Sequence, residues 1–207
     1  MKHSLRFIAS ATALGAAASP AFAHEGHETT GLLAGMLHPV TGADHLLVTL
    51  GLGLLAGLVS TLQVGGKPAA GAAGRLALAV VLGACAGVML VSVGLVGQTL
   101  SALAEPAAAL GLLVIALMLA GAERLSPRML AFAAAAVSLP HGLLHGLESQ
   151  GPAFLAGLVL TSLMLFAAGS LLGRQIASRG VQSAMRLRHL TAAGFAGLGM
   201  LLVGMPV

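Results

Sequence analysis

Residues 38–45 read HPVTGADH and lie in the first long apolar run of the chain, which extends over residues 31–62. As one helix this run would measure about 48 Å at about 1.5 Å per residue, whereas the hydrocarbon core of a bilayer is roughly 30 Å thick. Pro39 also disfavours helical geometry at His38. The stretch therefore predicts a broken or re-entrant first segment, with a short helix around 32–37, a break at 38–42 that lines a polar cavity, and a spanning helix from about Ala43.

The composition around this stretch is that of an all-α integral membrane protein. Of the 207 residues, 57% are apolar and only 8% are charged, whereas about 25% of the residues of a soluble domain are charged. The net charge of +4 does not indicate nucleic-acid binding, because the basic residues fall in short connections between apolar runs. The single cysteine, Cys85, excludes an intramolecular disulfide and a cysteine-rich metal site.

The N-terminus has the three parts of a cleavable signal peptide, residues 1–23. Lys2 and Arg6 supply the positive region, an apolar stretch follows, and Ala-Phe-Ala at 21–23 gives a small-residue cleavage site. An uncleaved helix is the alternative, but the apolar stretch is too short to span a bilayer. Cleavage would leave residues 24–30 as an external tail. This is either a plain polar tail or a loose metal-capturing segment with His24, Glu25, His27 and Glu28.

Five further apolar runs are read as membrane spans. They are residues 76–96, 106–122, 127–147, 152–172 and 189–205. All basic residues after the leader fall in alternate connections: Lys67, Arg75, Arg124, Arg128, Arg174, Arg179, Arg186 and Arg188. The positive-inside rule places these connections in the cytoplasm. We therefore expect residues 31–207 to form a six-transmembrane-helix bundle in a bacterial cytoplasmic (inner) membrane, with both termini on the external, periplasmic side.

A second polar cluster lies near the end of the predicted fourth span. His141, His145 and Glu148 are spaced four and three apart, so they share one face of a helix. In the predicted topology they lie on the same side of the membrane as His38, Asp44 and His45. Imidazole and carboxylate ligands suit Ni²⁺, Co²⁺ and Zn²⁺. Hydrogen bonding between helices is the alternative role, but polar side chains inside spans are costly and usually functional.

The two clusters together resemble the motifs of the HupE/UreJ family of nickel and cobalt permeases. The first is His38 followed by Asp44-His45, and the second is His141-Gly142-x-x-His145-Gly146-x-Glu148. The similarity extends over essentially the whole chain after the leader. It implies that the motif residues His38, Asp44, His45, His141, His145 and Glu148 carry Ni²⁺, or in some members Co²⁺, often for hydrogenase or urease. The second motif is commonly preceded by an aromatic residue, whereas this chain has Pro140.

The expected function is therefore import of a divalent metal ion by a permease rather than enzymatic chemistry. The partners are the ion and the lipid bilayer, and no permanently bound cofactor is expected. No phosphate-binding loop for ATP is visible, because Gly66-Lys67 is followed by Pro68. Two alternatives are a metal-sensing or accessory membrane protein that does not transport, and an intramembrane metal-dependent hydrolase. The second lacks the His-Glu-x-x-His arrangement of known zinc hydrolases.

Overall fold

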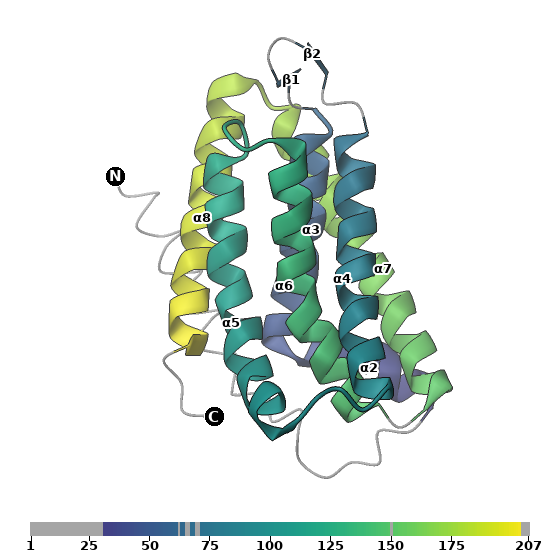
Figure 1. Ribbon diagram of the computed structural model, residues 1–207. Coiled ribbons are helices and arrows are strands. Elements are labelled where there is room, and N and C mark those ends of the chain that lie inside the picture. The colour runs from purple at the N-terminus through teal and green to yellow at the C-terminus, as the bar shows by residue number, and fades with distance from the viewer. Residues whose placement is uncertain (1–30, 62, 65–66, 69–70, 150, 204–207) are drawn as a thin grey trace.

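The apolar runs form long helices that lie side by side (Figure 1). The computed structural model describes residues 31–61, 63–64, 67–68, 71–149 and 151–203. Within them the helices are α2 (Leu32–Thr41), α3 (Ala43–Val59), α4 (Ala72–Ser92), α5 (Gln98–Gly121), α6 (Pro127–Glu148), α7 (Pro152–Ala177) and α8 (Val181–Val203). A short antiparallel hairpin of β1 (Gln63–Val64) and β2 (Lys67–Pro68) joins α3 to α4. The predicted signal peptide and external tail, including His24, Glu25, His27 and Glu28, lie outside the described residues.

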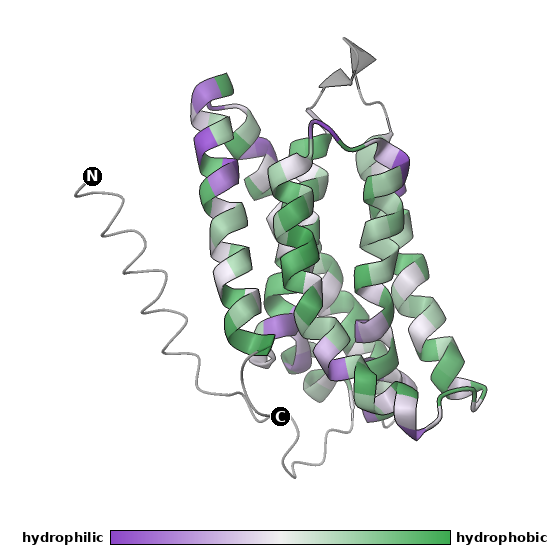
Figure 2. Cartoon of the chain, turned by 60° about the vertical axis from the view of Figure 1, so that its left-hand side comes forward, coloured by the Kyte–Doolittle hydropathy of each residue, from purple (hydrophilic) through white to green (hydrophobic). Residues whose placement is uncertain are grey.

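The outer surface of the bundle has the apolar character of a surface that faces lipid. Figure 2 shows hydrophobic residues along the middle of the helices, with hydrophilic residues gathered toward the ends. Large apolar side chains point outward, such as Phe132 at 78% and Leu117 at 72% exposure. A soluble protein rarely exposes contiguous apolar surface of this extent. The chain is therefore a multi-pass membrane protein.

Five membrane spans are supported by the length and composition of the described helices. α4, α5, α6 and α7 are each long and apolar enough to cross a bilayer, and α2 with α3 qualifies as one broken span. α8 is not among them, because its first half carries Arg186, Arg188 and His189. The predicted sixth span therefore stays a prediction. The helix itself is longer than the predicted span, since α8 begins at Val181, eight residues before residue 189.

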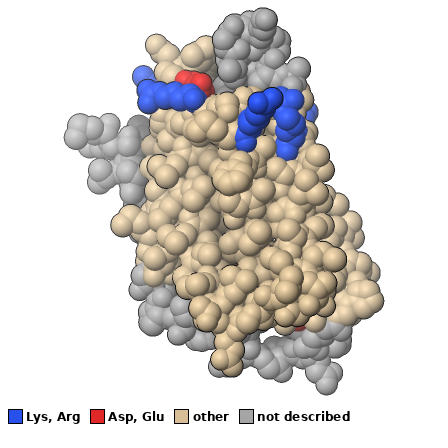
Figure 3. Space-filling model, in the orientation of Figure 1, with Lys and Arg blue, Asp and Glu red and all other residues tan. Residues whose placement is uncertain are grey.

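The arginines of the described residues lie at one end of the bundle. α3, α5 and α7 run in one direction and α4, α6 and α8 in the other, so the connections after α3, α5 and α7 share an end (Figure 1). Figure 3 shows Lys and Arg side chains at this end of the visible face. Here the buried Arg188 donates a hydrogen bond to Glu123 Oε1 at 2.6 Å, which ties α8 to the end of α5.

The first segment is broken at a single residue, Gly42, where α2 and α3 meet at 81°. The expected break at 38–42 was wrong in its extent, because α2 continues through His38 and Pro39 to Thr41. Both His38 and Pro39 are buried, and we attribute the continued helix to this packing, which offsets the local cost of the proline ring. Gly42 then ends the helix in an extended conformation, with φ −82° and ψ 114°.

The start of α5 also differs from the prediction. Pro106 was expected at the first position of the span, but α5 begins at Gln98 and contains Pro106 in its interior. Ala104 and Ala108 on either side of the proline are buried in a cluster with Leu143 and Leu144 of α6. This packing stabilises two additional turns of α5 and covers the end of α6 that carries the second polar cluster.

Glycines join α2 and α3 to α7 at very short range. A Cβ added at Gly57 of α3 would overlap the backbone carbonyl oxygen of Ser170 of α7, and a Cβ at Gly173 of α7 would overlap that of Leu54. The same applies to Gly35 of α2, which faces the start of α7. Small residues allow this approach, which supplies packing energy between membrane helices. α2, α3 and α7 therefore form one packed unit.

A second unit is built in the same way from α4 and α6. Gly83 and Gly87 of α4 lie against the backbone of α6, and Gly142 of α6 lies against the carbonyl of Ala84. α3 packs chiefly on α7, whereas α6 packs chiefly on α4. α3 and α6 belong to different units and meet through side chains, such as His45 of α3 and His145 of α6. We call this boundary between the two units the seam.

Replacement of Gly57 by valine tests the packing of the first unit. The added side chain would collide with the α7 backbone, so we expect the Gly57→Val variant to lose at least about 2 kcal/mol of unfolding free energy. Unfolding of the purified protein in detergent, followed by circular dichroism, measures this loss. Gly74→Val is the matched control, because a Cβ at Gly74 of α4 meets nothing within 4 Å. Equal stability of both variants would contradict the close packing.

Candidate metal site

The two polar clusters meet at the seam, where α2, the start of α3 and the end of α6 lie at the end of the bundle opposite the basic connections (Figure 1). The break at Gly42 turns α2 across this end, so His38 faces the start of α3. α6 reaches the same place with its last two turns. All six residues singled out in the sequence are brought together: His38, Asp44, His45, His141, His145 and Glu148. That these residues bind metal stays a prediction.

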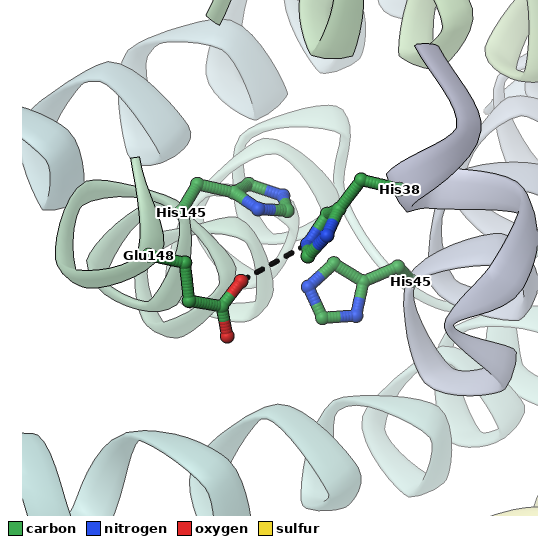
Figure 4. A group of neighbouring side chains, drawn as sticks. All are labelled: His38, His45, His145 and Glu148. Atoms are coloured by element: carbon green, nitrogen blue, oxygen red, sulfur yellow. Dashed lines mark ion pairs between the residues drawn. The ribbon is translucent and has the colours of Figure 1, made fainter. Parts of the chain in front are cut away.

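Four of them form what we call the outer group: His38, His45, His145 and Glu148. One ligand atom from each residue lies within 4.8 Å of the others. Figure 4 shows the three rings and the carboxylate converging from α2, α3 and α6, with His38 Nε2 3.0 Å from Glu148 Oε2. The three histidines are buried, while the Glu148 side chain keeps 20% exposure. Glu148 therefore stands at the mouth of the group.

His38 is held in place by an aromatic neighbour from α7. The rings of His38 and Phe154 pack edge to face with centroids 5.4 Å apart, and Phe154 is fully buried. His38 also lies 5.2 Å from the His45 ring and 5.3 Å from the His145 ring, between centroids. Phe154 thus restricts the orientation of the His38 ring through this contact. Sequence reasoning missed this residue, because a lone phenylalanine near a helix start has no distinguishing pattern.

The remaining residues form what we call the inner group: Asp44, His45 and His141. One ligand atom of each again lies within 4.8 Å of the others. His45 Nδ1 lies 2.8 Å from Asp44 Oδ1, and the His45 and His141 rings are 5.1 Å apart. His45 is therefore common to both groups.

Hydrogen bonds define which ring nitrogens are available to a metal. A carboxylate and a carbonyl only accept, so His45 Nδ1 donates to Asp44, and His141 Nδ1 donates to the Val137 carbonyl oxygen at 3.1 Å. In neutral rings the lone pair then sits on Nε2 of both histidines, and neither Nε2 has a hydrogen-bond partner among the described residues. Figure 4 shows one ring nitrogen of His45 directed at the outer group. In metal-binding histidines, the ring nitrogen that does not bind the metal commonly donates a hydrogen bond that orients the ring.

This arrangement can hold a borderline divalent cation. Buried polar atoms are normally satisfied, yet His45 Nε2, His141 Nε2 and His145 Nδ1 are buried and make no hydrogen bond among the described residues. An ion at the seam would satisfy them. Three imidazoles and a carboxylate are ligands suited to Ni²⁺, Co²⁺ or Zn²⁺.

The chain is similar to proteins of one family. The family described as HupE / UreJ protein matches residues 12–203. Protein HupE of Rhizobium leguminosarum bv. viciae is 30% identical over 164 residues, which cover 76% of this chain and 79% of the relative. No solved structure matches the chain significantly.

Mild acid should weaken metal binding at this cluster, because imidazole binds a metal only in its neutral form. Between about pH 7.5 and about pH 5.5, we expect the dissociation constant for Ni²⁺ to rise at least about tenfold. Isothermal titration calorimetry of the purified protein in detergent measures it. The His189→Ala variant removes an exposed histidine of α8 outside the cluster and should keep the same pH profile. An affinity that does not change with pH would rule out imidazole ligands.

Proposed function

Because the chain belongs to the HupE/UreJ family, we propose that it is a membrane permease that imports Ni²⁺, or Co²⁺, into the cytoplasm. The family is associated with nickel and cobalt transport for hydrogenase or urease, and its members are transporters or accessory proteins rather than enzymes. The proposal assigns the permease to residues 31–207. The metal ion is its substrate, and we propose no permanently bound cofactor.

The observation that carries this proposal is the buried outer group between two packed units. His38 and His45 belong to the unit of α2, α3 and α7, whereas His145 and Glu148 belong to the unit of α4 and α6. An ion bound there is held by both units at once. A relative movement of the units would change the ligand geometry, which is what a transporter needs in order to bind an ion and then release it.

The charge distribution supports import as the direction of transport. The positive-inside rule places the basic end (Figure 3) in the cytoplasm, and the ligand cluster at the opposite end then faces outward. In a bacterial inner membrane this orientation puts both termini on the external side after removal of residues 1–23. The tail with His24, Glu25, His27 and Glu28 would lie on the same side as the cluster and could capture ions loosely.

The membrane potential is sufficient to drive the import of a divalent cation. Moving two positive charges down about 100 mV yields about 4.6 kcal/mol. This corresponds to a concentration ratio of roughly three decades, since about 1.4 kcal/mol equals one decade. The proposal therefore needs neither ATP nor a coupling ion.

Uptake of radioactive Ni²⁺ into liposomes that contain the purified protein tests the proposal. We expect uptake that increases with a negative-inside potential. Replacement of His45, the residue common to both groups, by alanine should lower uptake at least about tenfold through loss of a ligand. The His189→Ala variant should transport normally, since His189 lies at the basic end.

The outcomes separate the proposed permease from its alternatives. Ni²⁺ binding without any uptake by the wild-type protein would indicate a sensor or accessory subunit. Metal-dependent cleavage of a membrane substrate would indicate a hydrolase. Competition by Co²⁺ and Zn²⁺ in the same assay establishes which metal is preferred.

A further inference from the structure

The six ligand residues do not form a single coordination shell. Metal–nitrogen bonds measure about 2.1 Å, so the ligands of one ion lie within about 4 Å of one another. The ligand atoms separate into the outer group of His38, His45, His145 and Glu148 and the inner group of Asp44, His45 and His141, with His45 in both. On the basis of the proposed function, we propose that the transported ion occupies two successive positions, first the outer group and then the inner group, with His45 as the shared ligand.

The order of the two positions follows from α6. Glu148 is the last residue of this helix, His145 lies three residues before it, and His141 lies one further turn away. At about 1.5 Å per residue, His141 is about 6 Å farther than His145 from this end of the helix. Along α6 exposure follows the same order, since the Glu148 side chain is 20% exposed whereas His145 is 8% and His141 is 6% exposed. The inner group also contains Asp44, whose side chain comes from the start of α3 and keeps 29% exposure. An ion that enters at Glu148 therefore reaches His145 before it reaches His141.

His45 lies between the two positions. Its ring centroid is 4.7 Å from that of His145 and 5.1 Å from that of His141. An ion can therefore exchange ligands from α6 while it stays close to the same residue of α3. The Asp44 carboxylate belongs to the inner position, and its Oδ1 accepts the hydrogen bond from His45.

Among the described residues, the inner position borders apolar side chains of the bundle interior. A Cβ added at Gly111 of α5 would lie 3.9 Å from His141 Cε1, 3.1 Å from Val137 Cγ1 and 3.9 Å from Val48 Cγ2. Ser138 is a buried polar residue of the same helix, but its hydroxyl donates to the Ala134 carbonyl oxygen of α6. An ion at His141 therefore meets apolar side chains ahead of it. It can move on only after the two units have shifted.

Two variants separate capture of the ion from its handover. His141→Ala removes a ligand of the inner group alone. Asp44→Asn keeps an oxygen that can accept the His45 hydrogen bond but removes the negative charge from the inner group. For both variants we expect a dissociation constant for Ni²⁺ within about threefold of the wild-type value by calorimetry. Uptake into liposomes should nevertheless fall at least about tenfold.

Two matched histidine variants serve as references for these measurements. His38→Ala removes a ligand of the outer group and should weaken Ni²⁺ binding at least about tenfold. His189→Ala should change neither binding nor uptake. Size-exclusion profiles and circular dichroism check folding, and the nearly isosteric Asp44→Asn variant keeps the test valid should His141→Ala fold poorly.

The results distinguish failure of the two positions from failure of the permease proposal. Binding that is weakened by Asp44→Asn or His141→Ala as strongly as by His38→Ala, with the wild type still transporting, would show one shared shell and overturn the two positions. Full uptake by both inner-group variants would overturn them as well. A wild-type protein that binds Ni²⁺ but transports none would overturn the proposed function itself.

Discussion

The structure depends on close backbone contact between helices that lie in lipid. Lipid chains are as apolar as leucine, so no hydrophobic force drives these helices together, and packing must supply the attraction. Glycines on both sides of the α3–α7 and α4–α6 contacts bring one helix against the carbonyl oxygens of the next. These contacts tie the helices into two units and leave α3 and α6 facing each other across a seam, where side chains rather than backbones meet.

The polar cluster of histidines and carboxylates lies in this seam. Burial of several imidazoles costs free energy unless their nitrogens find partners, and in the described residues some of them find none. The cluster is thus a local departure from the apolar, well-satisfied interior elsewhere, where Leu52, Leu112 and Ile115 are fully buried. A site of this kind contributes little to the stability of the empty protein, and its unpartnered ring nitrogens are what a bound cation would satisfy, as the proposed function requires.

Much of this arrangement could be predicted from the sequence. Pro127 and Pro152 start helices as expected, because a proline at the first helical position loses no hydrogen bond. The same rule was wrong at Pro106, where packing of Ala104 and Ala108 against α6 extends the helix. The Asp44–His45 hydrogen bond could not be predicted from the sequence either, since neighbouring residues on a helix do not normally face each other. It forms where α3 begins, beside the Gly42 break.

The short α2 has a consequence for the environment in which the protein works. Its buried side carries His38, while Leu32, Leu33, Leu37 and Val40 are about half exposed or more on the other side. An apolar face of this kind is suited to contact with acyl chains, and the depth of a membrane helix responds to the local thickness of the hydrocarbon layer. If His38 binds the ion as we propose, a change in lipid chain length acts on the helix that carries this histidine, and the fatty-acid composition of the host membrane influences metal capture.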